Sequence, residues 1–146
     1  MSQRLIPLVS LLLSVALPAR AAEIVACGGS RVVIFDADQP EAENPIVKWS
    51  WDVTEATNLP PRYQKLLVPL DECKPVRTNT QLLLTSSGGG AVLLDRKTRQ
   101  PLFYAQVPMA HSAEILPGDR IAVALSTHAQ GNSLEIYSAS QPETVL

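Results

Sequence analysis

Short apolar runs separated by polar turns make up the chain after residue 21. Many of these runs are rich in β-branched residues or leucine, and no segment has a helical period of useful length. Residues 46–53 alternate, and only one face of that segment (Val47, Trp49, Trp51 and Val53) is wholly apolar. The pattern predicts an all-β protein, with strands at residues 24–26, 32–35, 46–53, 81–85, 91–95, 102–107, 112–116, 121–125, 134–137 and 143–146.

The segments between these strands carry few helix signals. Residues 54–65 read as a connection, with one helical turn around Arg62–Leu66. Residues 67–76 contain Pro69 and Pro75, which predicts an irregular strand at the margin of a sheet. Gly88–Gly90 joins two strands and lacks the Lys-Ser/Thr pair of a phosphate loop, so it is predicted to be a hairpin turn.

A strand–turn–strand unit recurs along the chain. Its copies are residues 24–36, 82–95 and 121–137. About 42 residues separate the second and third copies, which fits the roughly 40–45 residues of a four-stranded propeller blade. About 59 residues separate the first two, which fits if residues 54–70 are an insertion. We therefore interpret the chain as a β-propeller-like radial array of four-stranded antiparallel blades.

This alignment of the repeats predicts about three blades. The first blade lacks its inner strand, the second is complete, and the third starts at His111 and is truncated in its outer strand. A ring needs at least four blades, so this ring is incomplete and would need further blades or self-association to close. The favoured interpretation is part of a longer propeller, and the alternative is a β-sandwich of repeated hairpins.

Residues 1–21 have the features of a secretory signal peptide. Arg4 precedes an apolar run, and Ala19 and Ala21 occupy the positions that a signal peptidase reads. The mature chain, residues 22–146, would be one partial β-propeller domain that is periplasmic or secreted. Without Arg4 and Arg20 it has 10 basic against 14 acidic residues, a net charge of about −4. With no basic patch and no long apolar run after cleavage, neither nucleic acid nor a membrane span is expected.

Two stretches carry a resemblance to a known family. They are GGGAVLLDRKTRQPLFYAQVPMAHSAEILPGDRIAVALS (residues 88–126) and DECKPV (residues 71–76). They resemble exported bacterial β-propeller domains of uncharacterised function, with a WD- or quinoprotein-like blade pattern. The similarity covers nearly all of residues 22–146, as the N-terminal half of such a domain. It implies fold and export, and it implies no particular activity.

The inner strands of a propeller line its central channel, so polar residues on them are the candidate ligand-binding residues. A histidine with carboxylates can act as an acid–base pair or bind a ligand. His111 and Glu114 are three residues apart, which places them on opposite faces of a strand and argues against a shared metal. No metal or cofactor is predicted. The six candidates from neighbouring blades are Asp71, Glu72, Lys74, His111, Ser112 and Glu114.

The cysteines and tryptophans leave alternatives open. Cys27 and Cys73 are candidates for a disulfide in an oxidising compartment, but Cys27 would also fit a core as a small apolar residue. Cys73 beside Lys74 as a nucleophile is disfavoured. Trp49 and Trp51 are predicted to pack between blades, with a sugar-stacking platform as the alternative.

The predicted function is an exported scaffold that binds a small molecule, glycan, peptide or protein partner on its channel face. One alternative is a periplasmic hydrolase or lyase that uses His111 with Asp71, Glu72 or Glu114. The other is a purely structural or interaction module. No catalytic residue is assigned from the sequence.

Overall fold

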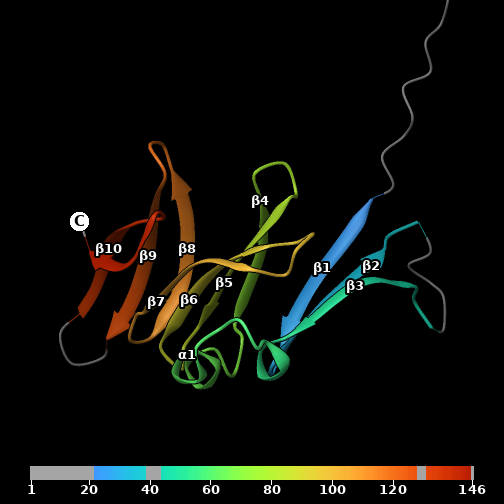
Figure 1. Ribbon diagram of the computed structural model, residues 1–146, viewed down its shortest axis with the longest axis horizontal. Helices are drawn as coiled ribbons and strands as arrows, with labels where there is room; N and C mark the ends of the chain where they lie inside the picture. Colours follow the sequence, from blue (N-terminus) through green and yellow to red (C-terminus); the bar gives the residue numbers. More distant parts are fainter. Residues whose placement is uncertain (1–21, 39–43, 128–130, 146) are drawn as a thin grey trace, which may run out of the picture.

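A computed structural model describes residues 22–38, 44–127 and 131–145 (Figure 1). Within these ranges the chain is nearly all β, with three antiparallel sheets and one short α-helix. The predicted signal peptide lies outside them. The elements are β1 (Glu23–Gly28), β2 (Arg31–Asp36), β3 (Val47–Asp52), the 3-10 helix η1 (Val53–Glu55), α1 (Pro61–Leu66), β4 (Glu72–Val76), β5 (Gln81–Ser86), β6 (Gly90–Asp95), β7 (Pro101–Gln106), β8 (Ala110–Leu116), β9 (Arg120–Thr127), β10 (Gly131–Ser138) and β11 (Gln141–Val145).

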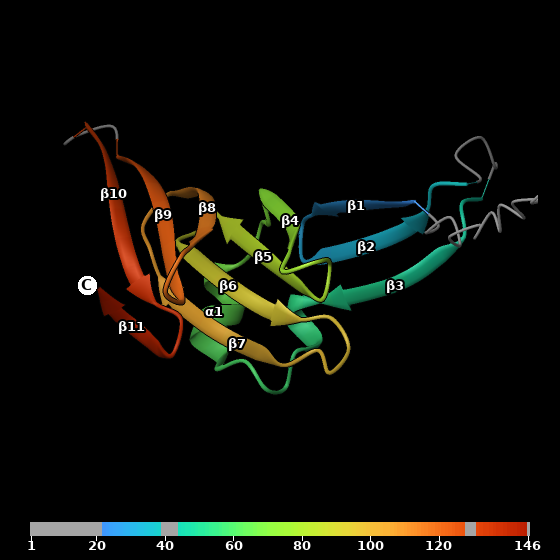
Figure 2. The ribbon, with the colours of Figure 1, turned by 90° about the horizontal axis from the view of Figure 1, so that it is seen from above.

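Each sheet is a meander, and we call the sheets blades 1, 2 and 3. Blade 1 is β1-β2-β3, blade 2 is β4-β5-β6-β7, and blade 3 is β8-β9-β10-β11. Figure 2 shows them side by side, with β1, β4 and β8 along one margin and β3, β7 and β11 along the other. The predicted fold class, an incomplete propeller-like array of antiparallel blades, is confirmed.

Contacts between blades fix the place of each strand. The first strand of blade 3, β8, packs mainly on β5, the second strand of blade 2. In the same way β4 packs on β1, so β1 has the place of a second strand, and within the described residues blade 1 has no inner strand, as predicted. Pro75 lies on β4, an edge strand, where the missing N–H removes no bond to a neighbouring strand.

Blade 3 differs from the prediction of a truncated outer strand. Residues 141–145 pair with β10 as β11, which also lies beside β7. The sequence of β11 (QPETV) is polar at its start and contains a proline, and the strand therefore begins two residues before the one predicted at residues 143–146. An edge position tolerates both features, and blade 3 therefore has four strands.

Two apolar cores lie between the blades. Trp51 and Val32 of blade 1 belong to the first core, which blade 2 completes, and Phe103 of blade 2 meets blade 3 in the second. Successive residues of β5 point alternately into these two cores, with Leu82 and Leu84 in the first and Leu83 in the second. Blade 2 is thus buried on both faces, which is why β5 and β6 read as continuous apolar runs.

The segment between β3 and β4 is an insertion that packs on blade 2. Its helix α1 contacts β7, and the buried Tyr63 ring lies 4.5 Å from the Tyr104 ring, centroid to centroid. Pro61 begins the helix, where the missing N–H has no intrahelical partner to lose. The predicted helical turn is confirmed, and the insertion accounts for the longer spacing of the first two repeats.

The turn at Gly88–Gly90 joins β5 to β6 beneath the end of this insertion. A Cβ atom on Gly88 would lie 2.8 Å from the Leu66 carbonyl oxygen and 2.9 Å from that of Val68. Gly89 has a φ of +110°, which glycine adopts without strain. The predicted hairpin turn is confirmed. Residue 88 must be glycine because the carbonyl oxygens of Leu66 and Val68 lie too close to leave room for a Cβ atom.

We expect Gly88→Ala to lower the free energy of unfolding by about 2 kcal/mol or more, because its Cβ would displace main-chain carbonyls. Gly28→Ala is the control, since a Cβ there meets nothing within 4 Å and the expected change is below about 1 kcal/mol. Urea unfolding measures both. Equal effects of the two substitutions would contradict the close approach at Gly88.

Substitutions at two neighbouring residues of β7, one buried and one exposed, test the packing of the second core. Phe103 is fully buried, with its ring edge-on to Tyr137 at a centroid distance of 5.7 Å, whereas Leu102 is 42% exposed. We expect Phe103→Ala to cost about 3–5 kcal/mol of stability and Leu102→Ala less than about 1 kcal/mol. Urea unfolding monitored by circular dichroism gives both values, and a larger cost at Leu102 would refute this strand orientation.

Candidate functional site

Four of the six predicted site residues meet at the inner margin, where β4 and β8 lie beside each other. Lys74 Nζ lies 2.6 Å from Glu114 Oε1 and 3.4 Å from Glu72 Oε1. Ser112 Oγ donates to Glu72 Oε1 at 3.2 Å, and the Ala113 N–H donates to Glu72 Oε2 at 3.3 Å. We call this set of contacts the inner-edge network.

The other two predicted residues lie outside the network. The Asp71 carboxylate accepts a hydrogen bond from the Ser87 N–H and so supports the glycine turn. His111 is exposed, and its carbonyl oxygen accepts from Thr85 Oγ1 at 3.3 Å. The His111 ring makes no hydrogen bond or ion pair with any described residue. The described residues therefore form no His111–carboxylate pair of the kind the hydrolase alternative requires.

The electrostatics of the network favour a charged lysine. Partial burial of the Lys74 ammonium opposes its charge, but the hydrogen bond to Glu114 and the charge of Glu72 outweigh that effect and raise the pKa of Lys74 above its ordinary value. Each charged group in the network already has a partner of opposite charge. The arrangement is suited to holding blade 2 against blade 3.

We expect a double-mutant cycle of Lys74→Ala and Glu114→Ala to give a coupling energy of about 0.5–1 kcal/mol at low salt, as for partly exposed ion pairs. The coupling should fall as salt is raised. Because the folded-state pKa of Lys74 is raised above 10.5, its contribution is complete below pH 10.5 and is lost as the pH rises through the folded value. Urea unfolding measures the cycle, and zero coupling at low salt would contradict the network.

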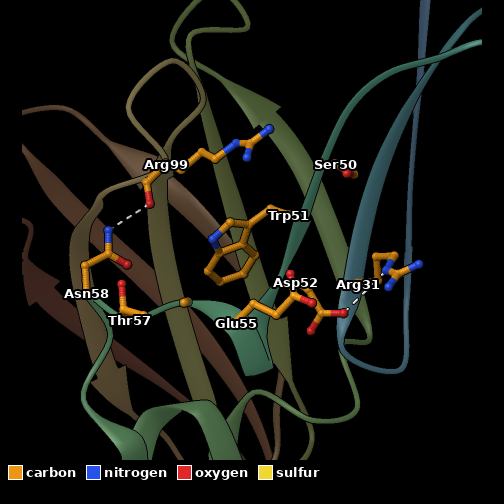
Figure 3. Close-up of a pocket in the computed structure, with 9 residues that line it drawn as sticks. Arg31, Ser50, Trp51, Asp52, Glu55, Thr57, Asn58 and Arg99 are labelled. Atoms are coloured by element: carbon orange, nitrogen blue, oxygen red, sulfur yellow. Dashed lines mark hydrogen bonds and ion pairs between the residues drawn. The ribbon is translucent and has the colours of Figure 1, made fainter.

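A separate open cleft of about 420 Å³ lies where blade 1 meets the insertion and the β6–β7 turn. Figure 3 shows residues of these segments arranged around Trp51. Asn58 Nδ2 donates to the Arg99 carbonyl oxygen at 3.1 Å and so joins two of its walls. The lining residues are Arg31, Ser50, Trp51, Asp52, Glu55, Ala56, Thr57, Asn58 and Arg99.

Trp51 supplies a hydrogen-bond donor to this cleft. Its side chain is only 6% exposed, and its indole Nε1 donates to no described residue. In Figure 3 this nitrogen is on the side of the ring that faces Asn58 and Thr57. The neighbouring Trp49 instead donates its Nε1 to the Arg96 carbonyl oxygen at 2.9 Å. The two tryptophans pack toward blade 2, as predicted.

Both signs of charge lie around the cleft. The Arg99 guanidinium lies 5.8 Å from the centre of the Trp49 ring and forms no ion pair with a described residue. Arg31 Nε lies 3.4 Å from Asp52 Oδ2. A hydrogen bond from the Thr54 hydroxyl is the main cause that lowers the pKa of Asp52. The cleft can therefore donate to a carboxylate or carbonyl and accept from an amide or amine.

No sequence pattern indicates this cleft directly, because its residues come from four separate segments. Trp51 and Asp52 end a strand, and the only local sign of a special site was Asp52, whose side chain caps η1 by accepting from the Thr54 N–H at 2.9 Å. Cys27 and Cys73, in contrast, do come together: they lie on the packed strands β1 and β4, and Cys27 is near enough to raise the pKa of the Cys73 thiol. Both cysteines are free thiols in this structure.

The described residues lack both a metal-binding cluster and a membrane-spanning helix. They contain no group of three or more His, Cys, Asp or Glu side chains placed to hold a metal ion. Their helices also include none with the length and apolarity to cross a membrane.

The fold defines the protein as a propeller-like all-β scaffold. The chain belongs to DUF6528, a family of unknown function whose sequence profile matches residues 11–139. No curated protein matches it. A crystal structure of a eukaryotic initiation factor is similar in fold, with a TM-score of 0.51 and 10% sequence identity over 85% of this chain. The match spans only 28% of that chain and shows the fold alone.

Proposed function

We propose that the protein is an exported binding module that holds a short peptide segment in the cleft around Trp51. The signal-peptide pattern of residues 1–21 supports export. The charge of the cleft supports a peptide, because a peptide presents both N–H donors and carbonyl or carboxylate acceptors. The bound ligand would bridge the Arg99 and Asp52 sides of the cleft.

One observation carries this proposal: a tryptophan N–H and an arginine without an ion pair border an open cleft. Trp51 Nε1 has no partner among the described residues and is not one of their fully buried atoms, so it is open to a ligand that accepts a hydrogen bond in the cleft. Arg99 would add a charge-assisted hydrogen bond to a carboxylate. Glu55, which forms no ion pair with a described residue, would accept from the amide or amine end.

The same geometry argues against the glycan and channel-face alternatives. Stacking on a sugar needs an exposed ring face, whereas Trp51 is 6% exposed and Arg99 covers Trp49. At the channel face, the polar groups of the inner-edge network already bind one another. A ligand at the channel face would have to replace these existing ion pairs. A ligand in the cleft could bind Arg99 and Glu55 without breaking an ion pair between described residues.

We expect the full chain to bind members of a pool of uncapped tetrapeptides, with a change in tryptophan fluorescence because Trp51 lines the cleft. Arg99→Gln should weaken the binding by about 10-fold or more, since a hydrogen bond to a charged group contributes about 1.5–3 kcal/mol. Lys97→Gln, in the same turn but outside the cleft lining, is the matched control and should leave affinity unchanged.

His111→Ala distinguishes binding in the cleft from binding on the channel face, because His111 is on the inner margin and does not line the cleft. Unchanged affinity in this variant supports the cleft. A loss of affinity in His111→Ala but not in Arg99→Gln would place the ligand on the channel face and overturn the proposal. Absence of any peptide binding would favour the purely structural module.

A further inference from the structure

Cys27 and Cys73 lie opposite each other across the boundary between blades 1 and 2. Cys27 is on β1 and Cys73 is on β4, strands that pack against each other. Both side chains are partly buried against the first core, and Cys27 is near enough to affect the pKa of the Cys73 thiol. Both are free thiols in this structure. The chain has 2 cysteines in all, so neither has another partner within it.

We propose that Cys27 and Cys73 form a disulfide that covalently joins blade 1 to blade 2. Formation breaks two S–H bonds and makes one S–S bond, and it releases two protons and two electrons. The oxidant is a second disulfide, such as oxidised glutathione or a thiol–disulfide oxidoreductase, which is reduced to two thiols. The compartment predicted from residues 1–21 supplies such oxidants.

The proposed disulfide lies on β1, an edge strand of blade 1. In the described part of the chain, β1 has a strand neighbour on one side only, because blade 1 has no inner strand. Side-chain packing and the ion pair of Arg96 Nη1 with Glu23 Oε2, at 2.9 Å, hold β1 to blade 2. A covalent link at Cys27 would fix this edge and restrict the unfolded chain across a long loop.

The surroundings of Cys73 determine how the bond would form. Burial, followed by the hydrogen bond with Cys27, raises the pKa of the Cys73 thiol to about 12. The thiolate is the reactive form, and the raised pKa leaves little of it at neutral pH. We therefore expect slow oxidation of the folded, reduced protein and fast oxidation during refolding, when Cys73 is exposed to water.

The test uses the full chain refolded in a buffer of reduced and oxidised glutathione. We expect an intact mass lower by two hydrogen atoms, a proteolytic map that links the Cys27 peptide to the Cys73 peptide, and no free thiol in denaturant. Reduction should lower the melting temperature by roughly 10 °C. The Cys27→Ser/Cys73→Ser double variant is the matched control, and reductant should leave its melting temperature unchanged.

Two free thiols in the refolded, denatured protein would overturn the proposal, as would a disulfide between two chains in place of the internal one. The wild-type protein provides its own reduced form, so the test does not depend on the folding of the double variant. It is also independent of the peptide site, since neither cysteine lines the cleft. Loss of peptide binding with an intact disulfide would refute the proposed function alone.

Discussion

The structure depends on the burial of apolar side chains on both faces of blade 2. Leu82 and Leu84 of β5 face blade 1, and Leu83 between them faces blade 3. Removal of this surface from water is the main favourable term in folding, and here one sheet contributes to two cores at once. Blades 1 and 3 each have one face against blade 2, so their positions follow from its two apolar surfaces.

Polar interactions then have different roles at different margins. At the inner margin, Lys74, Glu72 and Glu114 compensate one another's charge and connect neighbouring blades. At the cleft, the insertion between β3 and β4 brings Asn58 against the β6–β7 turn. Among the described residues, Trp51 Nε1 has no hydrogen-bond acceptor there and Arg99 has no ion-pair partner. The repeated sheets thus supply a frame, and the irregular segment inserted into it supplies the candidate binding site.

The sequence predicted what depends on local pattern and repetition. Continuous apolar runs gave β5 and β6, and the repeat placed β4 and β8 on adjacent inner edges, so that Glu72, Lys74, Ser112 and Glu114 were expected together. Their mutual neutralisation depends on side-chain distances that no pattern encodes. The start of β11, two residues earlier than predicted, and the cleft were missed for a similar reason, because an edge position and contacts between distant segments determine them.

Amide hydrogen exchange of the full chain tests whether the array of blades depends on blade 2, because it reports the local stability of each strand. We expect the amides of β5 and β6 to exchange most slowly, since both strands lie between the two cores. Amides of β1 and β11, which lie at sheet edges, should exchange faster. Slowest exchange in blade 1 or blade 3, with β5 and β6 exchanging early, would contradict the dependence of the array on blade 2.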